Sequence, residues 1–120
     1  MYQKLITKTE EKKWIKLSLE NGANTKLVTD PRIIAHFFYP YTGWDWWAIE
    51  YYPEEQRFYG LVRGREIEYG HFSIPEFEAA KLPMNLPIER DMYWDDTTTI
   101  SDIKEKLKQT SDTFQNEMGV

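Results

Sequence analysis

Two glutamates inside aromatic, strand-like runs are the residues best suited to catalysis. Glu50 lies between Ile49 and Tyr51, in a run of otherwise apolar and aromatic side chains. If Glu50 pointed inward, desolvation would favour the protonated form that a general acid needs. Glu68, in a later run, could face it and complete a carboxylate pair of the kind that glycosidases use. The alternative is that Glu50 points outward or pairs with an arginine, because the sequence does not fix the separation of the two carboxylates.

The triplet Glu89-Arg90-Asp91 is the strongest polar candidate for recognition. It follows Pro83 and Pro87, which impose an extended path on the chain. A guanidinium held there could bind a carboxylate or a phosphate through two parallel hydrogen bonds. The alternative is structural, with Arg90 pairing internally to Glu50 or Glu68 and holding this segment on the sheet.

The two histidines, His36 and His71, lie in separate strand-like runs. With Glu50 or Asp91 they could supply imidazole and carboxylate ligands to a metal ion. Ser73, His71 and Asp91 could also be imagined as a nucleophile, a base and an orienting acid. Neither set has a supporting motif, since the chain has no HExxH or HxH spacing, no GxSxG elbow and no GxxxxGK[ST] loop. We therefore predict no metal site and no cofactor.

The loop over residues 39–47 is the best candidate for binding. Its Pro/Gly turn displays Tyr41 and Trp44, whose rings could stack on a base, a sugar or a side chain of a partner. In the alternative, Trp46 and Trp47 cover the two faces of a sheet while Trp44 packs against the first helix. The predicted binding residues are Tyr41, Trp44, Arg90 and Tyr93.

The elements that must position these residues follow from caps and periodicity. A helix is expected over residues 7–22, because Thr7 and Glu10 form a capping box and Asn21-Gly22 is a good stop. Strand-like runs follow at 33–39, 46–52, 57–62 and 66–72. Ser73 then caps a short helix, residues 88–94 are expected as an edge strand, and apolar spacing predicts a helix over 99–109.

Short polar connections and aromatic enrichment favour an antiparallel meander over parallel βαβ units. The expected fold is α+β, a single domain over residues 1–120 with a meander of four to five strands, an N-terminal helix, a short helix and a C-terminal helix. Residues 1–30 would form the first helix and its lead-in, 31–94 the sheet core, 95–109 the last helix and 110–120 a flexible tail.

Composition limits the classes of function. The 120 residues carry a formal net charge of -5 and no cysteine, which excludes disulfides, thiolate metal sites and a cysteine nucleophile. An acidic chain lacks the basic face that nucleic-acid binding normally needs. No apolar run reaches the roughly 18 residues of a membrane span, and the first residues lead into a charged segment. We expect a cytoplasmic protein with no membrane or nucleic-acid partner.

Several blocks of the sequence carry a family resemblance. Its most specific part is Leu86-Pro87-Ile88-Glu89-Arg90-Asp91 with Tyr93 and Trp94, accompanied by Phe58-Tyr59-Gly60-Leu61-Val62 and Glu68-Tyr69-Gly70-His71-Phe72-Ser73. Over about residues 31–105 the chain resembles the bacterial and phage family known as domain of unknown function 2958, departing from the usual pattern at His71 and Asn85. The resemblance implies an accessory protein of plasmids, phages and conjugative elements, and it implies no assigned activity.

Two functional hypotheses follow. The first is a non-enzymatic protein-interaction module of a mobile element, whose protein partner is a host or defence component. The second is a small carboxylate-based hydrolase or nucleotide-binding enzyme that uses Glu50, Glu68, Glu89 and Asp91, either with or without a divalent cation. We favour the first, because aromatic residues are abundant and no catalytic motif is present. Binding of single-stranded nucleic acid to an aromatic sheet is a third hypothesis, which the charge disfavours.

Overall fold

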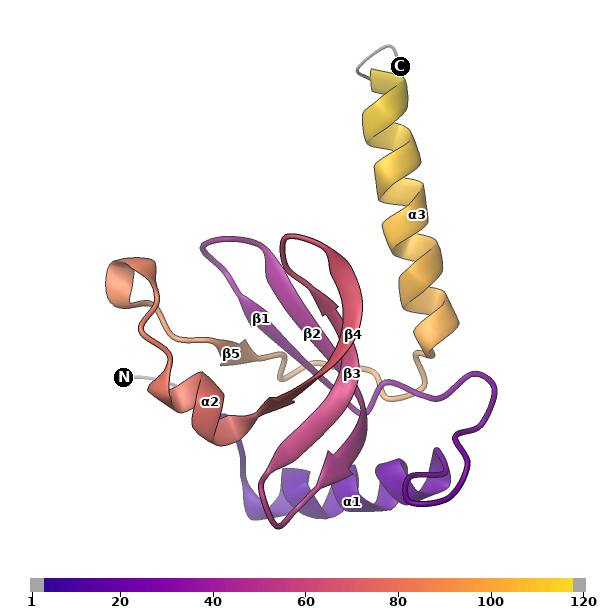
Figure 1. Ribbon diagram of the computed structural model, residues 1–120, viewed down its shortest axis with the longest axis vertical. Helices are drawn as coiled ribbons and strands as arrows, with labels where there is room; N and C mark the ends of the chain where they lie inside the picture. The colour runs from indigo at the N-terminus through magenta and orange to yellow at the C-terminus, as the bar shows by residue number, and fades with distance from the viewer. Residues whose placement is uncertain (1–3, 118–120) are drawn as a thin grey trace.

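The fold is a five-stranded antiparallel sheet with helices on both faces (Figure 1). The computed structural model describes residues 4–117, and the side chains of residues 4–109. In chain order the elements are α1 (Lys8–Glu20), β1 (Ala35–Tyr39), β2 (Trp44–Tyr52), β3 (Arg57–Arg63), β4 (Ile67–Ser73), α2 (Ile74–Ala79), the 3-10 helix η1 (Pro83–Asn85), β5 (Glu89–Arg90) and α3 (Ile100–Glu117). This arrangement confirms the predicted α+β class.

The sheet has the strand order β4-β3-β2-β1-β5. The first four strands form a meander because short turns connect them, and the chain then returns past α2 to place β5 beside β1. A β-bulge interrupts β2 between Ala48 and Glu50. A bulge places two residues of one strand opposite one residue of its neighbour. As a result Glu50 lies opposite Tyr59, and the alternation of side chains along β2 reverses at Ile49.

One face of the sheet, here called the α1 face, is covered by α1 and α2. Trp14 of α1 is 1% exposed, and its ring meets the rings of Phe37, Tyr51 and Phe58 at centroid distances of 6.0, 5.5 and 5.2 Å. Phe77 of α2 packs on Phe37 at 5.2 Å. Truncating a buried aromatic such as Trp14 to alanine typically costs about 3–5 kcal/mol, so these rings are the main anchors of the two helices.

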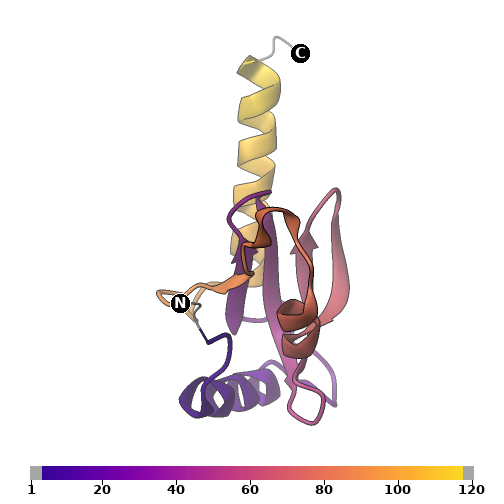
Figure 2. The same cartoon turned by 90° about the vertical axis from the view of Figure 1, so that its left-hand side faces the viewer.

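The opposite face, here called the α3 face, is covered over a smaller area. Ile100 and Ile103 from the first turn of α3 pack against Trp47 and Leu61. Leu107 still packs against this cluster, and farther along the helix projects away from the sheet, as Figures 1 and 2 show. The helix continues past its predicted end at 109 to Glu117, and residues 118–120 of the predicted tail lie outside the described residues. Across the described part of the chain, no helix has both the length and the apolar character needed to cross a bilayer.

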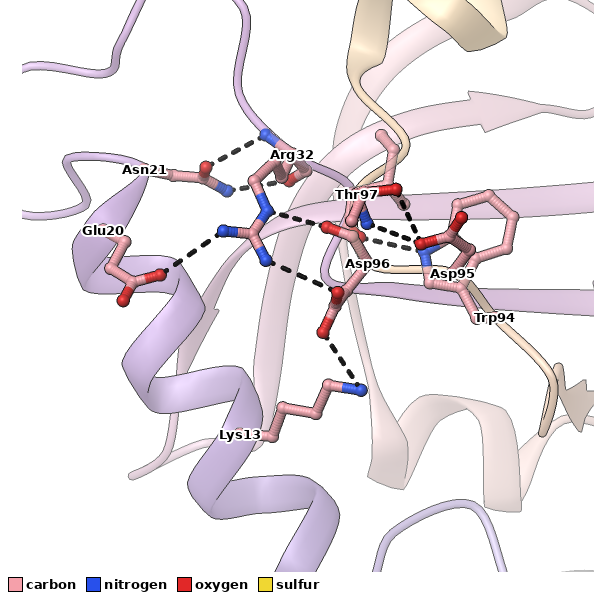
Figure 3. Close-up of polar contacts among 9 residues, drawn as sticks. Lys13, Glu20, Asn21, Arg32, Trp94, Asp95, Asp96 and Thr97 are labelled. Atoms are coloured by element: carbon pink, nitrogen blue, oxygen red, sulfur yellow. Dashed lines mark hydrogen bonds and ion pairs between the residues drawn. The ribbon is translucent and has the colours of Figure 1, made fainter.

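A polar cluster fastens α1 to the segment that leads into α3 (Figure 3). Arg32 donates from Nε to the carbonyl of Asp96 at 2.7 Å, and its guanidinium lies 3.4 Å from the Asp96 carboxylate and 3.6 Å from that of Glu20. Lys13 of α1 also reaches Asp96, at 3.2 Å. The side-chain amide of Asn21 donates to the Arg32 carbonyl at 2.8 Å. Arg32 and Lys13 thus share the carboxylate of Asp96, which fixes the start of α3 relative to α1.

The last strand is shorter than the predicted edge strand over 88–94. Only Glu89 and Arg90 belong to β5, although the backbone N–H of Asp91 still donates to the His36 carbonyl at 2.9 Å. The Asp91 carboxylate then accepts the backbone N–H of Tyr93 at 3.0 Å. An aspartate that bonds the backbone two residues on creates a local turn, and this turn ends the strand.

Candidate functional site

The glutamates proposed as a catalytic pair lie on opposite faces of the sheet. Glu50 is paired with Tyr59 and so points to the α3 face, whereas Glu68 is paired with Val62 and points to the α1 face. The Glu50 carboxylate accepts the Tyr52 hydroxyl. Burial and this contact raise the pKa of Tyr52 to about 12. The predicted pairing of Glu50 with Glu68 is therefore wrong, because the sheet itself separates them.

Arg90 is held inside the molecule. Its side chain is 10% exposed, and Nη1 lies 3.6 Å from the carboxylate of Glu10 on α1. The internal partner is thus a residue of the first helix, and the prediction of Glu50 or Glu68 in that role was wrong. Glu89, paired with Phe38, points to the α3 face, while Arg90, paired with Phe37, points to the α1 face. The acid–Arg–acid triplet therefore does not present one continuous surface.

His36 organises the main polar cluster of the α3 face. Its Nε2 lies 2.7 Å from Asp45 Oδ1, and its Nδ1 lies 3.1 Å from Asp91 Oδ2. Arg63 donates to the other oxygen of Asp45, and the imidazole stacks on the Trp47 ring at 5.4 Å with an interplanar angle of 7°. Burial alone would raise the pKa of Asp45, but hydrogen bonds from His36 and Arg63 outweigh it and hold the pKa below its usual value.

The partners of His36 limit what its ring can do in proton transfer. Both imidazole nitrogens of His36 face carboxylates, so neither is open to a substrate as a general base requires. His71 lies on β4, across β3 and β2 from His36, and its Nδ1 contacts Arg57 at 2.6 Å. The two histidines therefore do not share a site. Among the side chains described, those of residues 4–109, no three His, Asp or Glu are arranged to hold a metal ion.

The aromatic residues predicted for binding lie in two places. Tyr41 lies in the β1–β2 turn and is 54% exposed, Trp44 begins β2 and is 37% exposed, and Tyr93, after β5, is 95% exposed. The Trp44 ring stands beside Trp46 at 5.8 Å and rests over Gly64, where an added Cβ would come within 2.4 Å of it. Trp44 therefore packs on the β3–β4 turn, not against the first helix.

A groove of about 680 Å³ crosses the α1 face beyond the part that α1 covers. We call it the Trp groove. Its floor comes from three neighbouring strands, and its wall comes from α2 and the connection that follows. The floor residues are Trp44, Trp46, Val62, Gly70 and Phe72, and the wall residues are Phe77, Leu82 and Pro83.

Gly70 keeps this groove open. A Cβ added at Gly70 would meet no atom within 4 Å, whereas one at Gly60, directly opposite on β3, would lie 1.9 Å from the carbonyl oxygen of Trp47. The two positions thus hold glycine for different physical reasons. Gly60 allows close packing of the backbone, and Gly70 leaves open space in the groove. No sequence pattern distinguishes the two glycines or singles out Asp45, since only tertiary contacts give these residues their roles.

Fold and site together define a small α+β protein with an antiparallel meander and an open aromatic groove on one face. The family model described as "Protein of unknown function (DUF2958)" matches residues 5–112. Since the match covers most of the chain, the protein belongs to this family, which confirms the resemblance found in the sequence. No curated protein and no solved structure gives a significant match.

Proposed function

We propose that this protein is a non-enzymatic protein-interaction module whose partner docks in the Trp groove. The observation that supports the proposal is the groove itself, a space of about 680 Å³ lined by large aromatic side chains. Trp44 is 37% exposed there. Aromatic rings in a partly open hollow are typical anchors of protein interfaces, because they bury much area with little loss of side-chain freedom.

The charges around the groove favour a protein partner over nucleic acid. Glu68 and Glu76 line it together with Arg65, and the whole chain has a formal net charge of -5. A phosphate backbone would be repelled by this rim. An apolar side chain of a partner protein, flanked by a basic residue, would complement it.

The enzyme hypothesis has less support from the geometry. General acid–base chemistry needs two groups within reach of one reacting atom. Glu50 and Glu68 point to opposite faces of the sheet, and the His36 nitrogens are both occupied by aspartates. The proposal therefore assigns no catalytic residue.

The biological setting of the proposal comes from the sequence resemblance. It is that of an accessory protein of a phage, plasmid or conjugative element, which works in the cytoplasm and binds a host or defence protein. The groove supplies the contact surface in this setting. The segment around Tyr93, outside the groove, is not needed for it.

The test compares substitutions that fill or strip the groove. Tagged wild-type chain is used to capture proteins from host lysate treated with nuclease, and mass spectrometry reads the result. Gly70→Trp should fill the groove and Trp44→Ala should remove an anchor, so both should lose the partner. Gly70→Ala and Tyr93→Ala are the matched controls and should keep it.

Circular dichroism and thermal unfolding of each variant test whether the fold is retained. Capture of the same protein by Gly70→Trp would place the contact elsewhere and contradict the proposal. A partner that disappears on nuclease treatment would point instead to nucleic acid.

A further inference from the structure

The outer edge of β4 is a free sheet edge. The strand order places β4 at one end of the sheet, and no other strand in the described part of the chain pairs with its outer side. β4 has seven residues, whereas β5 at the other edge has two. Ile67 and Tyr69 on this strand are 53% and 41% exposed. β4 is therefore the longer of the two edges and carries exposed apolar surface.

The ladder to β3 fixes which backbone groups face outward. The backbone N–H of Gly64 donates to the carbonyl of Glu66, and that of Ile74 donates to the carbonyl of Gln56, each at 3.0 Å. Bonded pairs alternate with non-bonded pairs in an antiparallel ladder. The even-numbered residues of β4 therefore bond to β3, and the odd-numbered ones turn their N–H and C=O outward. Those outward residues are Ile67, Tyr69, His71 and, at the end of the strand, Ser73.

This edge has little of the usual protection against pairing. Natural edge strands are blunted by charged side chains, above all lysine, or by proline, a bulge or a covering segment. Of these, β4 carries the carboxylate of Glu68. β4 contains neither proline nor lysine, and its register with β3 is regular from Ile67 to Ser73. Lys104 of α3 does reach this strand, with Nζ 4.9 Å from the centre of the Tyr69 ring, on the α3 face rather than at the edge. The outward amides thus remain accessible to an extended segment.

The Trp groove opens onto this same edge. Tyr69 and His71 border the groove although their side chains point to the α3 face, so it is their backbone that the groove reaches. A strand added beside β4 would send alternate side chains to the α1 face. Gly70 has open space where its own Cβ would lie. The side chain that the added strand places opposite Gly70 could therefore enter the groove.

Charge selects the kind of segment that fits. Glu68 precedes Gly70 by two positions, faces the same side of the sheet and lines the groove. Glu76 of α2 also lines the groove. Neither carboxylate forms an ion pair with another residue among those described here. A second copy of this acidic chain would bring further carboxylates to the edge, whereas a segment carrying lysine or arginine would neutralise them.

We infer that β4 pairs edge to edge with an extended segment of a partner protein, which carries a large apolar side chain and, two residues away, a lysine or arginine. The inference rests on the proposed function and deepens it, since it names the backbone edge and the chemistry of the partner. Main-chain hydrogen bonds supply affinity in such strand addition, and the side-chain pocket supplies selectivity.

The test uses proline at an outward position. Tyr69→Pro removes an N–H that the ladder alternation turns away from β3, and edge strands tolerate proline at such positions. Tyr69→Ala is the matched control, because it removes the same ring and keeps the N–H. Ile67→Pro, at the first residue of the strand, is the second blocking variant if Tyr69→Pro does not fold.

The probe is a phage-displayed library of random heptapeptides selected on the full chain. We expect enriched peptides that alternate apolar and basic residues. Their affinity, measured by fluorescence anisotropy, should fall at least about tenfold in the proline variant and change less in Tyr69→Ala. The reason is that the lost hydrogen bond and the blocked approach of the peptide together cost more free energy than a tenfold change in the dissociation constant.

Three other outcomes contradict the inference, and they separate it from the proposed function. Peptides that bind the proline variants normally but fail on Gly70→Trp would leave the groove as the docking site without edge pairing. Failure to enrich any peptide would count against both proposals. Self-association of the wild-type chain in sedimentation velocity, lost in Tyr69→Pro and kept in Tyr69→Ala, would make a second copy the occupant of the edge.

Discussion

Asn21 should be among the most destabilising positions to truncate, although it is a polar residue at the end of a helix. Its side-chain amide donates to the carbonyls of Arg32 at 2.8 Å and of Ile49 at 2.9 Å, and its oxygen accepts the Arg32 backbone N–H at 3.0 Å. Ile49 sits at the β2 bulge, where the ladder to β3 is interrupted. Asn21 is 3% exposed, so water does not easily replace it.

The expected loss for Asn21→Ala is about 3 kcal/mol. A buried polar group left without a partner costs about 1–3 kcal/mol. The Ile49 carbonyl is buried and should contribute about 2 kcal/mol, and the two Arg32 groups, which are nearer to solvent, should contribute about 0.5 kcal/mol each. Against a typical domain stability of about 5–15 kcal/mol, this is a large fraction.

Urea unfolding followed by tryptophan fluorescence measures this loss as a fall in the midpoint at unchanged slope. Asn21→Asp keeps the size of the side chain but replaces its donor by a carboxylate oxygen that faces two carbonyls. A carboxylate at a helix C-terminus by itself costs roughly 1 kcal/mol of stability. Asn21→Asp should therefore destabilise the protein by more than this amount. The exposed amide variant Gln109→Ala is the control and should stay within about 0.5 kcal/mol of wild type. A wild-type midpoint for Asn21→Asp would refute the reasoning, because packing alone would then explain the site.

Three further predictions concern the sheet and its polar groups. Gly60→Ala should destabilise by more than about 2 kcal/mol in urea, because its Cβ would lie 1.9 Å from the Trp47 carbonyl oxygen, while Gly70→Ala should be neutral or slightly stabilising. The pKa of Asp45 is lowered in the fold from its ordinary value of 3.8, so its contribution to stability is fully present above pH 3.8 and is lost as the pH falls from there through the lower pKa of the folded state. Asp45→Asn should therefore flatten the acid side of a plot of unfolding free energy against pH. The pKa of Tyr52 is raised from 10.0 to about 12, so stability should decline between these pH values as the unfolded chain ionises first, and Tyr52→Phe should reduce that decline.

Local sequence signals predicted much of the fold because they act over a few residues. The Thr7 hydroxyl accepts the Glu10 backbone N–H at 3.2 Å, and Ser73 does the same for Glu76 at 3.2 Å, as the capping patterns indicated. Trp46 and Trp47 cover opposite faces of the sheet, as simple alternation requires. The class and the order of the elements followed from such signals.

The candidate site was less predictable, because its parts come from distant segments. His36 and Asp45 are nine residues apart and Asp91 is 55 residues from His36, and no motif links them. The partner of Arg90 is Glu10 on α1 rather than a glutamate of the sheet. Which charges meet depends on how α1 and β5 dock, and the sequence carries no local signal for that docking.

The sequence by itself determined the caps, the turns and the alternation that make an antiparallel meander flanked by helices. Only the tertiary structure decided the relation between Glu50 and Glu68. Without the bulge, Glu50 would follow Trp46 and Ala48 to the α1 face, where Glu68 also lies. The bulge turns Glu50 to the other face. The side-chain amide of Asn21, at the end of α1, donates to the Ile49 carbonyl and so stabilises the bulge. A single inserted residue reverses the direction of every side chain that follows it, and the contact that stabilises this insertion comes from another part of the chain.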